Sequence, residues 1–252
     1  MVEAQHEDPV PQFLRRLARG ASRKRVQPAP RSGVLASYLD HTLLRADATP
    51  ADVERLCAEA LEHSFAAVCV NGVYVRRCAR LLEGQGVAVC SVAGFPLGAS
   101  APAAKLFEVV RALEDGADEV DAVIAVGLLL AGDEPHVAGE LEALAQACHA
   151  AGGRLKAILE CSVLDQARKV RAAELARDAG CDFVKTSTGF GGGGATIQDV
   201  ALLRQTVGDQ VGVKAAGGVR DAPFARALIA AGADRIGCSV SVALVGSDEG
   251  PS

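Results

Sequence analysis

Two lysines stand in similar apolar settings in the last third of the chain. Lys185 ends the run CDFVK and precedes TSTGFGGGG, while Lys214 ends the run VGVK and precedes AAGG. Burial on a strand disfavours the ammonium form of a lysine and lowers its pKa, and the neutral amine is the form that attacks a carbonyl to give a Schiff base. The two settings therefore predict an amine nucleophile, and their spacing leaves open which lysine it is.

One carboxylate, Asp121, lies inside the apolar run EVDAVIAV and completes a workable site. Two lysines that face one cavity repel each other, and the less solvated one is driven toward the neutral amine. A nearby acid can then move a proton to and from the carbinolamine that precedes the imine. This chemistry uses neither a metal nor an organic cofactor, and we expect neither. The alternative for any one of these residues is a structural ion pair, such as Asp121 with Lys185.

Glycines recur where three late apolar runs end, at Gly189, at Gly217 with Gly218, and at Gly237. Glycine lets backbone N–H groups approach an anion closely, and Ser239 adds a hydroxyl at the start of a predicted short helix. A phosphate site built from the loops after strands seven and eight, next to a helix N-terminus, recurs in α/β barrels. We therefore expect a phosphate here. The alternative is that the glycine pair forms only a tight turn.

Five further residues on or just after predicted strands are candidates for the pocket, namely Asp40, Cys69, Asn71, Lys156 and Glu160. No basic residue adjoins Cys69 in the sequence, which favours an unreactive, packed thiol. His41 has no carboxylate and nucleophile in a recognisable triad order, so we interpret it as a hydrogen-bonded core histidine.

Short apolar runs alternate with helical patterns from residue 34 onward. Thr49 and Thr196 are helix N-cap signals, and Gly116, Gly180 and Gly232 suit the left-handed turn that closes a helix. The expected strands cover 38–44, 65–70, 87–95, 119–126, 154–160, 182–185, 210–215 and 235–237, and the expected helices include 137–150 and 239–245. Eight alternations predict a single closed (β/α)8 barrel, or TIM barrel, with parallel strands. An open doubly wound sheet is disfavoured because no glycine-rich phosphate loop follows the first strand.

The rest of the composition fits one domain with an N-terminal extension. Prolines and a basic patch favour a poorly ordered extension over residues 1–33, followed by the barrel at 34–247 and a tail at 248–252. The net charge of −5 argues against nucleic acid or an anionic membrane as a partner. No apolar run is long enough to span a bilayer, and the N-terminus lacks the apolar segment of a signal peptide.

Eight cysteines occur without a CxxC pair or a nearby histidine cluster, which argues against a zinc site. Such cysteines are typical of a reduced, cytoplasmic protein. The sequence leaves the oligomeric state open, and a homodimer is the commonest assembly.

Several motifs together resemble one enzyme family. They are LDHTL at 39–43, VCVN at 68–71, VAGFPLG at 92–98, GADEVD at 116–121, LKAILE at 155–160, FVKTSTG at 183–189, VKAAGGVR at 213–220 and GCS at 237–239. From 34 to 245 the chain resembles the deoxyribose-phosphate aldolases, which are class I lyases of deoxyribonucleoside catabolism. The resemblance implies a (β/α)8 barrel that reversibly cleaves 2-deoxy-D-ribose 5-phosphate into acetaldehyde and D-glyceraldehyde 3-phosphate.

The resemblance also implies a role for each site residue. Lys185 becomes the Schiff-base lysine, Lys214 the neighbour that lowers its pKa, and Asp121 the proton-transfer acid that works with a water molecule. The phosphate falls at Gly189, Gly217, Gly218 and Ser239. Departures from the usual family pattern occur at Cys161, Ala216, Cys238 and Val240, and they affect the expected phosphate affinity more than the reaction type.

Three other functions stay open on the sequence. Another Schiff-base aldolase acting on a different phosphosugar would share the barrel and the lysines. A phosphometabolite-binding barrel without catalysis is disfavoured because Asp121, Lys185 and Lys214 are all present. A nucleic-acid adaptor would use the basic extension, but it does not fit the acidic chain as a whole.

Overall fold

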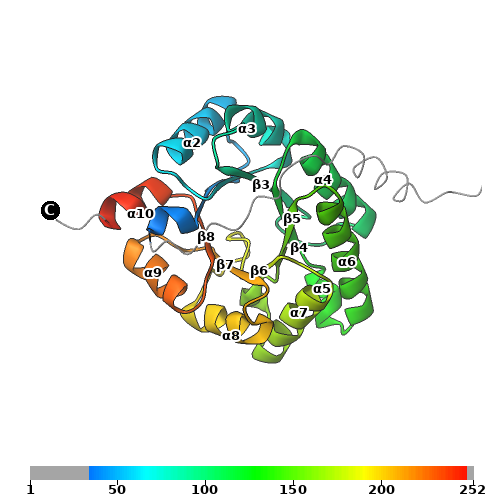
Figure 1. The fold of residues 1–252 in the computed structure, drawn as a ribbon. Helices are drawn as coiled ribbons and strands as arrows, with labels where there is room; N and C mark the ends of the chain where they lie inside the picture. Colours follow the sequence, from blue (N-terminus) through cyan, green and yellow to red (C-terminus); the bar gives the residue numbers. More distant parts are fainter. Residues whose placement is uncertain (1–33, 249–252) are drawn as a thin grey trace, which may run out of the picture.

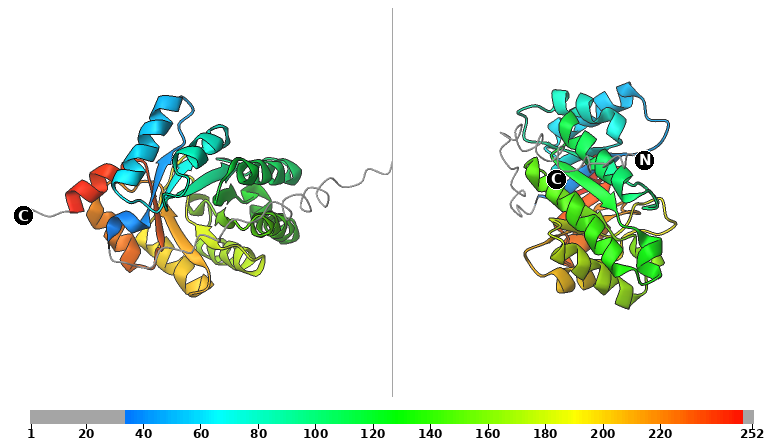
Figure 2. Two further views of the ribbon diagram at one scale, coloured as in Figure 1. Left: turned by 45° about the horizontal axis from the view of Figure 1, so that its top comes forward. Right: turned by 90° about the vertical axis from the view of Figure 1, so that its right-hand side faces the viewer.

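The computed structural model describes residues 34–248. Eight parallel strands form a barrel in chain order, closed by pairing of the first strand with the eighth, and helices ring it (Figures 1 and 2). The strands are β1 Leu39–Leu43, β2 Ala67–Val70, β3 Ala88–Ala93, β4 Glu119–Val123, β5 Arg154–Ile158, β6 Phe183–Lys185, β7 Gly212–Ala216 and β8 Arg235–Cys238. The predicted (β/α)8 barrel is confirmed. The predicted extension at 1–33 and residues 249–252 of the predicted tail lie outside the described residues.

Nine α-helices lie in the described part of the chain. They are α2 Pro50–Glu62, α3 Val75–Leu81, α4 Pro102–Asp115, α5 Val126–Leu130, α6 Glu134–Ala150, α7 Gln166–Asp178, α8 Ile197–Val207, α9 Ala222–Ala230 and α10 Ser241–Asp248. Short 3-10 turns add η1 Leu35–Tyr38, η2 Gly72–Tyr74 and η3 Cys161–Val163. Asp248, which the sequence analysis assigned to the tail, is the last residue of α10.

The local signals for helix ends are confirmed. Thr49 forms a reciprocal capping box with Asp52, and the Thr196 side chain accepts from the Asp199 amide. The glycines predicted to close helices all have positive φ, as at Gly116, where φ is 109°. Because these contacts are local, the sequence pattern alone could place them.

Alternate residues of each strand face opposite sides of the barrel wall. On β4, Val120 and Ala122 belong to the apolar core, whereas Glu119 and Asp121 bond to side chains of other strands. The apolar set packs between the strands and the surrounding helices. The polar set lies inside the barrel and groups the charged side chains there.

Several predicted boundaries were wrong; the fourth strand, for example, ends at Val123 rather than at 126. Three others lie next to the region of the strand-end candidates. The predicted fifth strand ends at Ile158 rather than at 160, because Glu160 takes a left-handed conformation with φ of 46° and leads into η3. The predicted third strand ends at Ala93, before Gly94 with φ of 60°. The last helix starts at Ser241, two residues later than predicted, so Ser239 lies in the loop that precedes it.

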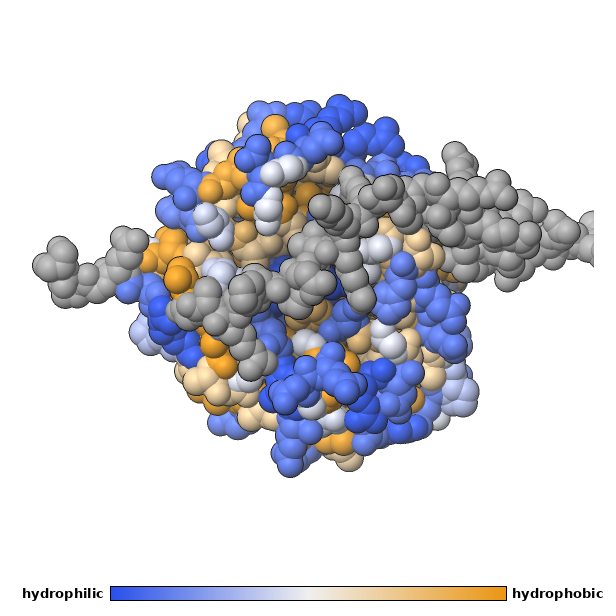
Figure 3. Space-filling view, viewed as in Figure 1, coloured by the Kyte–Doolittle hydropathy of each residue, from blue (hydrophilic) through white to orange (hydrophobic). Residues whose placement is uncertain are grey.

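One buried ion pair lies outside the barrel, between α4 and α6. Lys105 Nζ contacts Glu140 Oε2 at 2.9 Å and also donates to the Val123 carbonyl at 2.9 Å. The exterior seen in Figure 3 mixes hydrophilic and hydrophobic residues, and hydrophilic ones cover much of its upper, right and lower rim. Within residues 34–248, no helix combines the length and apolar character needed to cross a membrane.

Candidate active site

Asp121 is the centre of a buried cluster of three lysines. Its Oδ2 accepts from Lys185 Nζ at 2.9 Å and from Lys214 Nζ at 2.7 Å, and its Oδ1 accepts from Lys156 Nζ at 2.8 Å. The Asp121, Lys156 and Lys214 side chains are essentially inaccessible to solvent, while that of Lys185 is 3% exposed. The sequence analysis singled out Asp121, Lys185 and Lys214, and the fold brings all three together.

Strand register explains this arrangement. Lys185 on β6 pairs directly with Lys214 on β7, and Asp121 on β4 pairs with Lys156 on β5. Paired residues in a parallel sheet point to the same face, so all four side chains enter the barrel. Lys156 was one of the strand-end candidates and had no assigned role. Its place in RLKAI, where polar residues alternate with apolar ones, indicates an inward side chain.

Opposite charges inside the barrel stabilise the ionised forms of Asp121 and Lys214. Burial by itself raises the pKa of Asp121, but Lys156, Lys185 and Lys214 outweigh burial and keep that pKa well below its usual range. Burial lowers the pKa of Lys214, but the carboxylates of Asp121 and Asp40 outweigh it and raise that pKa well above the usual value. The two carboxylates therefore favour the charged form of Lys214.

A second layer of charges lies behind the first. Arg235 Nε donates to Asp40 Oδ1 at 2.7 Å, and Arg235 Nη2 donates to Glu119 Oε2 at 2.9 Å. Arg154 also pairs with Glu119, at 2.5 Å. The sequence analysis missed Glu119, Arg154 and Arg235, although each stands in a strand two residues from another inward-facing position.

A cavity of about 620 Å³ adjoins the lysine cluster at the carboxyl ends of the strands. It is bordered by six residues that the sequence analysis singled out, namely Lys185, Gly189, Gly217, Gly218, Gly237 and Ser239. Lys185 thus belongs both to the charged cluster and to the cavity wall. Asp121 and Lys214 lie behind it and do not line the cavity.

The glycines bring two loops into contact without intervening side chains. Ala195 N donates to the Gly217 carbonyl at 2.9 Å, and a Cβ added to Gly194 would collide with that same carbonyl. Gly217 has φ of 90°, a conformation that other residues rarely adopt. The main chains of the loops after β6 and β7 therefore meet at the cavity wall, as a phosphate site built from backbone groups requires.

Two arginines that the sequence analysis overlooked also line the cavity. Arg220 follows the glycine pair and is exposed, and Arg45 follows β1 and pairs with Asp47 at 2.7 Å and Asp52 at 2.5 Å. Guanidinium groups favour phosphate oxygens. A basic residue directly after each strand-end motif, in HTLLR and GGVR, is the signal that could have identified them.

Two phenylalanines form a wall near the lysine. Phe95 follows β3, and its ring centre lies 6.0 Å from Lys185 Nζ. Phe190, which lines the cavity, meets Phe95 edge to face with ring centres 5.3 Å apart. The amine therefore borders an apolar surface on one side and the glycine loops on the other.

The remaining candidates do not line the cavity. Asp40 is fully buried and pairs with Lys214 at 2.5 Å. The Glu160 carboxylate accepts from Ser162 Oγ at 3.0 Å and from Thr188 Oγ1 at 2.5 Å, so it shapes the loop after β6. Cys69 is fully buried as well.

The surroundings of Cys69 differ from the prediction. No basic residue adjoins it in sequence, but the charges of Lys214 and Lys185 act on it in the fold. A hydrogen bond with the Cys90 thiol lowers the pKa of Cys69. Burial opposes this shift, and the two lysines add to it.

His41 is a buried histidine whose Nε2 lies 2.7 Å from Glu59 Oε2, in agreement with its interpretation as a hydrogen-bonded core residue.

Ligand atoms of Cys69, Cys90 and Asp121 lie within 4.8 Å of one another. Both Asp121 oxygens already accept from lysine ammonium groups. The positive charge of those groups opposes a metal ion at this position.

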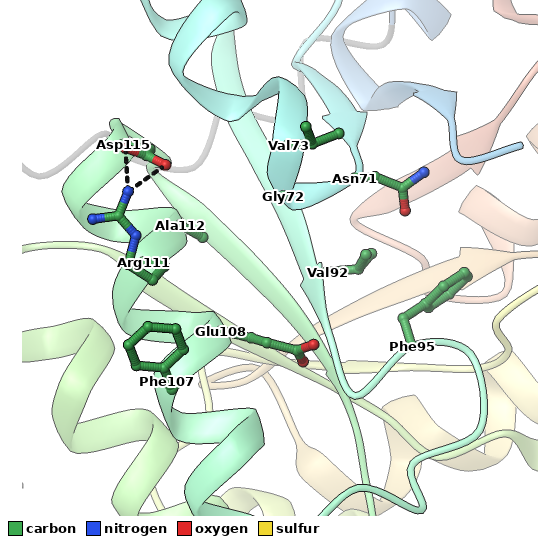
Figure 4. A pocket seen from close by; sticks show the side chains of 10 residues that line it. All are labelled: Asn71, Gly72, Val73, Val92, Phe95, Phe107, Glu108, Arg111, Ala112 and Asp115. Carbon is green, nitrogen blue, oxygen red and sulfur yellow. Dashed lines mark hydrogen bonds and ion pairs between the residues drawn. The ribbon is translucent and has the colours of Figure 1, made fainter. Parts of the chain in front are cut away.

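A second cavity, of about 330 Å³, lies on the outer side of the β3 loop against α4 (Figure 4). Phe95, Glu108, Arg111 and Asp115 are among its lining residues. Its charged groups are already engaged, because Arg111 pairs with Asp115 and Glu108 accepts from the Gly94 amide. It contains no residue of the lysine cluster, so the chemistry belongs to the first cavity.

Comparison with known proteins identifies the family of this chain. A family model described as DeoC/LacD family aldolase matches residues 34–249. The chain belongs to this family. Curated deoxyribose-phosphate aldolases of Geobacillus sp. (strain WCH70) and Thermococcus gammatolerans are 52% and 49% identical to it over 212 and 213 residues, which are 84% of this chain and 94% and 95% of theirs.

A solved family structure has the same fold. The deoxyribose phosphate aldolase of Aeropyrum pernix matches with a TM-score of 0.81 and 32% identity, over 95% of this chain and 98% of that one. The resemblance inferred from the motifs is confirmed.

Proposed function

We propose that this chain is a class I aldolase that reversibly cleaves 2-deoxy-D-ribose 5-phosphate into acetaldehyde and D-glyceraldehyde 3-phosphate. Family membership and the curated relatives support the reaction. The assignment of residues rests on one observation, namely that Lys185 belongs both to the charged cluster around Asp121 and to the wall of the cavity. Of the three lysines bonded to Asp121, it alone lines the cavity. It is therefore the amine that a substrate carbonyl can reach.

The reaction starts with the free amine of Lys185, which adds to the aldehyde carbon of the open-chain sugar. Asp121, 2.9 Å from this nitrogen, accepts the proton that the adding amine releases. It returns a proton to the carbinolamine hydroxyl, which leaves as water and gives the iminium. Lys214 and Lys156 keep their charges and hold the carboxylate in place.

The iminium then acts as the electron sink for cleavage of the C2–C3 bond. Asp121, which is a carboxylate again once water has left, accepts the proton of the C3 hydroxyl and later returns it to C2 of the enamine. The C2–C3 electron pair becomes the enamine, and D-glyceraldehyde 3-phosphate departs. Protonation of the enamine at C2 and hydrolysis of the resulting imine release acetaldehyde and restore the Lys185 amine. Gly189, Gly217, Gly218, Gly237 and Ser239 border the phosphate end, with Arg220 and Arg45 adding positive charge.

Borohydride trapping tests the nucleophile. Wild-type protein incubated with the deoxyribose phosphate and borohydride should carry a reduced adduct on Lys185 in peptide mass mapping. Lys185→Arg should lose both the adduct and the aldolase activity. Lys169→Arg serves as a matched control that retains a trappable Lys185, because Lys169 on α7 pairs with Asp199 on α8, outside the barrel. An adduct on Lys214 would keep the reaction and overturn our assignment of the lysines. No adduct on a folded wild type would contradict the proposed function.

The proposal also covers the compartment, the division of the chain and the assembly. We place the protein in the cytoplasm because all eight cysteines are free and buried, which suits a reducing compartment. The family match begins at residue 34, which supports a division into an extension at 1–33 and a barrel that follows. A homodimer remains the expected assembly, and light scattering would test it.

A further inference from the structure

Arg235 is a buried side chain that does not reach the cavity, and the reaction as proposed does not use it. It leaves β8 next to Lys214, its register partner on β7, and is 4% exposed. Its guanidinium contacts two carboxylates, one on the neighbouring strand β1 and one on β4 across the barrel. Nε contacts Asp40 on β1 at 2.7 Å, and Nη2 contacts Glu119 on β4 at 2.9 Å.

Each of these carboxylates also holds one lysine of the reactive cluster. Asp40 Oδ2 pairs with Lys214 Nζ at 2.5 Å, and Glu119 Oε2 pairs with Lys156 Nζ at 2.5 Å. Two arms therefore leave Arg235, one through Asp40 to Lys214 and the other through Glu119 to Lys156.

The two arms converge on one group. Lys214 contacts Asp121 Oδ2 at 2.7 Å, and Lys156 contacts Asp121 Oδ1 at 2.8 Å, so each arm fixes a different oxygen of that carboxylate. With both oxygens held, the carboxylate plane cannot rotate freely. Oδ2 is also the oxygen that faces Lys185, at 2.9 Å.

We infer that Arg235 is a positioning residue of the aldolase site, which orients Asp121 toward the Lys185 amine through the two carboxylate–lysine arms. This inference rests on the proposed function. A planar guanidinium can serve both arms at once because its donors diverge at fixed angles, whereas a lysine is a flexible point charge. Loss of the fork would let Asp40 and Glu119 shift toward their lysines and release Asp121 from its orientation.

The decisive substitution is Arg235→Lys, which keeps the buried positive charge and removes the fork. Imine formation is measured in a single turnover by borohydride quench on the variant and on wild type, together with kcat, KM and Tm. We expect imine formation and kcat to fall by about 10- to 100-fold, the loss typical of a misplaced catalytic group. KM for the deoxyribose phosphate should change by less than about threefold, because Arg235 does not line the cavity.

Glu140→Gln is the matched control, since it disrupts a buried ion pair outside the barrel, at Lys105. It should lower Tm and leave imine formation unchanged. If Arg235 had only a structural role, Arg235→Lys would likewise lower Tm and leave the rate of imine formation at the wild-type value. That outcome would overturn the inference. If Arg235→Lys does not fold, Glu119→Gln cuts the Lys156 arm alone and must still slow imine formation, and an unchanged rate there overturns the inference.

The same experiment separates this inference from the proposed function. A wild type that forms no adduct at Lys185 would overturn both. An adduct in wild type that forms at the same rate in Arg235→Lys would overturn only the positioning role.

Discussion

The buried charges of the barrel interior and the buried pair between α4 and α6 solve the same physical problem in different ways. Outside the barrel, the Lys105 ammonium meets one carboxylate, Glu140, and one carbonyl. Inside it, the single carboxylate of Asp121 is shared by three ammonium groups. Both clusters pay for the removal of charge from water, but only the interior one contains a cation, Lys185, that borders a cavity.

The difference distinguishes a structural ion pair from a reactive cluster. In the outer pair, one ammonium group is matched to one carboxylate, and both groups are stabilised in their charged forms. Inside the barrel, Lys214 and Lys156 hold the Asp121 carboxylate beside Lys185, so that Asp121 can take up a proton from this amine and pass it to the substrate. Burial alone does not mark a functional lysine, because Lys105 and Lys214 are equally inaccessible. A functional lysine is marked instead by a carboxylate that it shares with other cations and by access to a cavity.

The largest effect should follow from Asp121→Asn. The change removes the carboxylate that three ammonium groups share, so it eliminates the proton acceptor and leaves the cations facing one another. We expect kcat to fall by about 10²- to 10⁴-fold, measured by coupled assay of D-glyceraldehyde 3-phosphate release. A folded Asp121→Asn enzyme that keeps more than a tenth of wild-type kcat would show that the interior cluster is structural, like the outer pair.

Ser239→Ala should have an intermediate effect, confined to binding. Ser239 lines the cavity at its glycine end and is exposed, so it lies outside both ion clusters. Loss of one hydrogen bond to a charged phosphate should raise KM by about tenfold with little change in kcat. With unphosphorylated deoxyribose as substrate the variant should match wild type. An equal loss with both substrates would contradict a phosphate contact.

The smallest effect on catalysis should follow from Glu140→Gln. The substitution leaves the Lys105 charge without its carboxylate, so we expect unfolding free energy to fall by about 3 kcal/mol, measured by urea titration. Because α4 and α6 carry no residue of the lysine cluster, kcat and KM should stay at wild-type values below the unfolding transition. A fall in kcat would mean that the two charge clusters are coupled through the barrel wall.

Much of the fold and part of the site follow from local sequence. The capping threonines, the glycines of the helix–strand turns and the alternation of strands with helices are local features of the sequence, and they were predicted correctly. Lys185, Lys214 and Asp121 were identifiable as buried charges in apolar runs. The last helix, α10, was predicted to start at Ser239, two residues before its actual start at Ser241. No local signal separates the end of β8 from the start of this helix.

Only the tertiary structure decided which charges meet. Lys185 lies 64 residues from Asp121, Lys214 lies 93 residues from it, and Arg235 lies 195 residues from Asp40. These contacts exist because the sheet closes, which sets β8 beside β1 and directs alternate residues of every strand to one interior. Strand sequence determined which residues are polar and inward-facing. Barrel closure and register determined their partners, and hence which lysine faces the cavity.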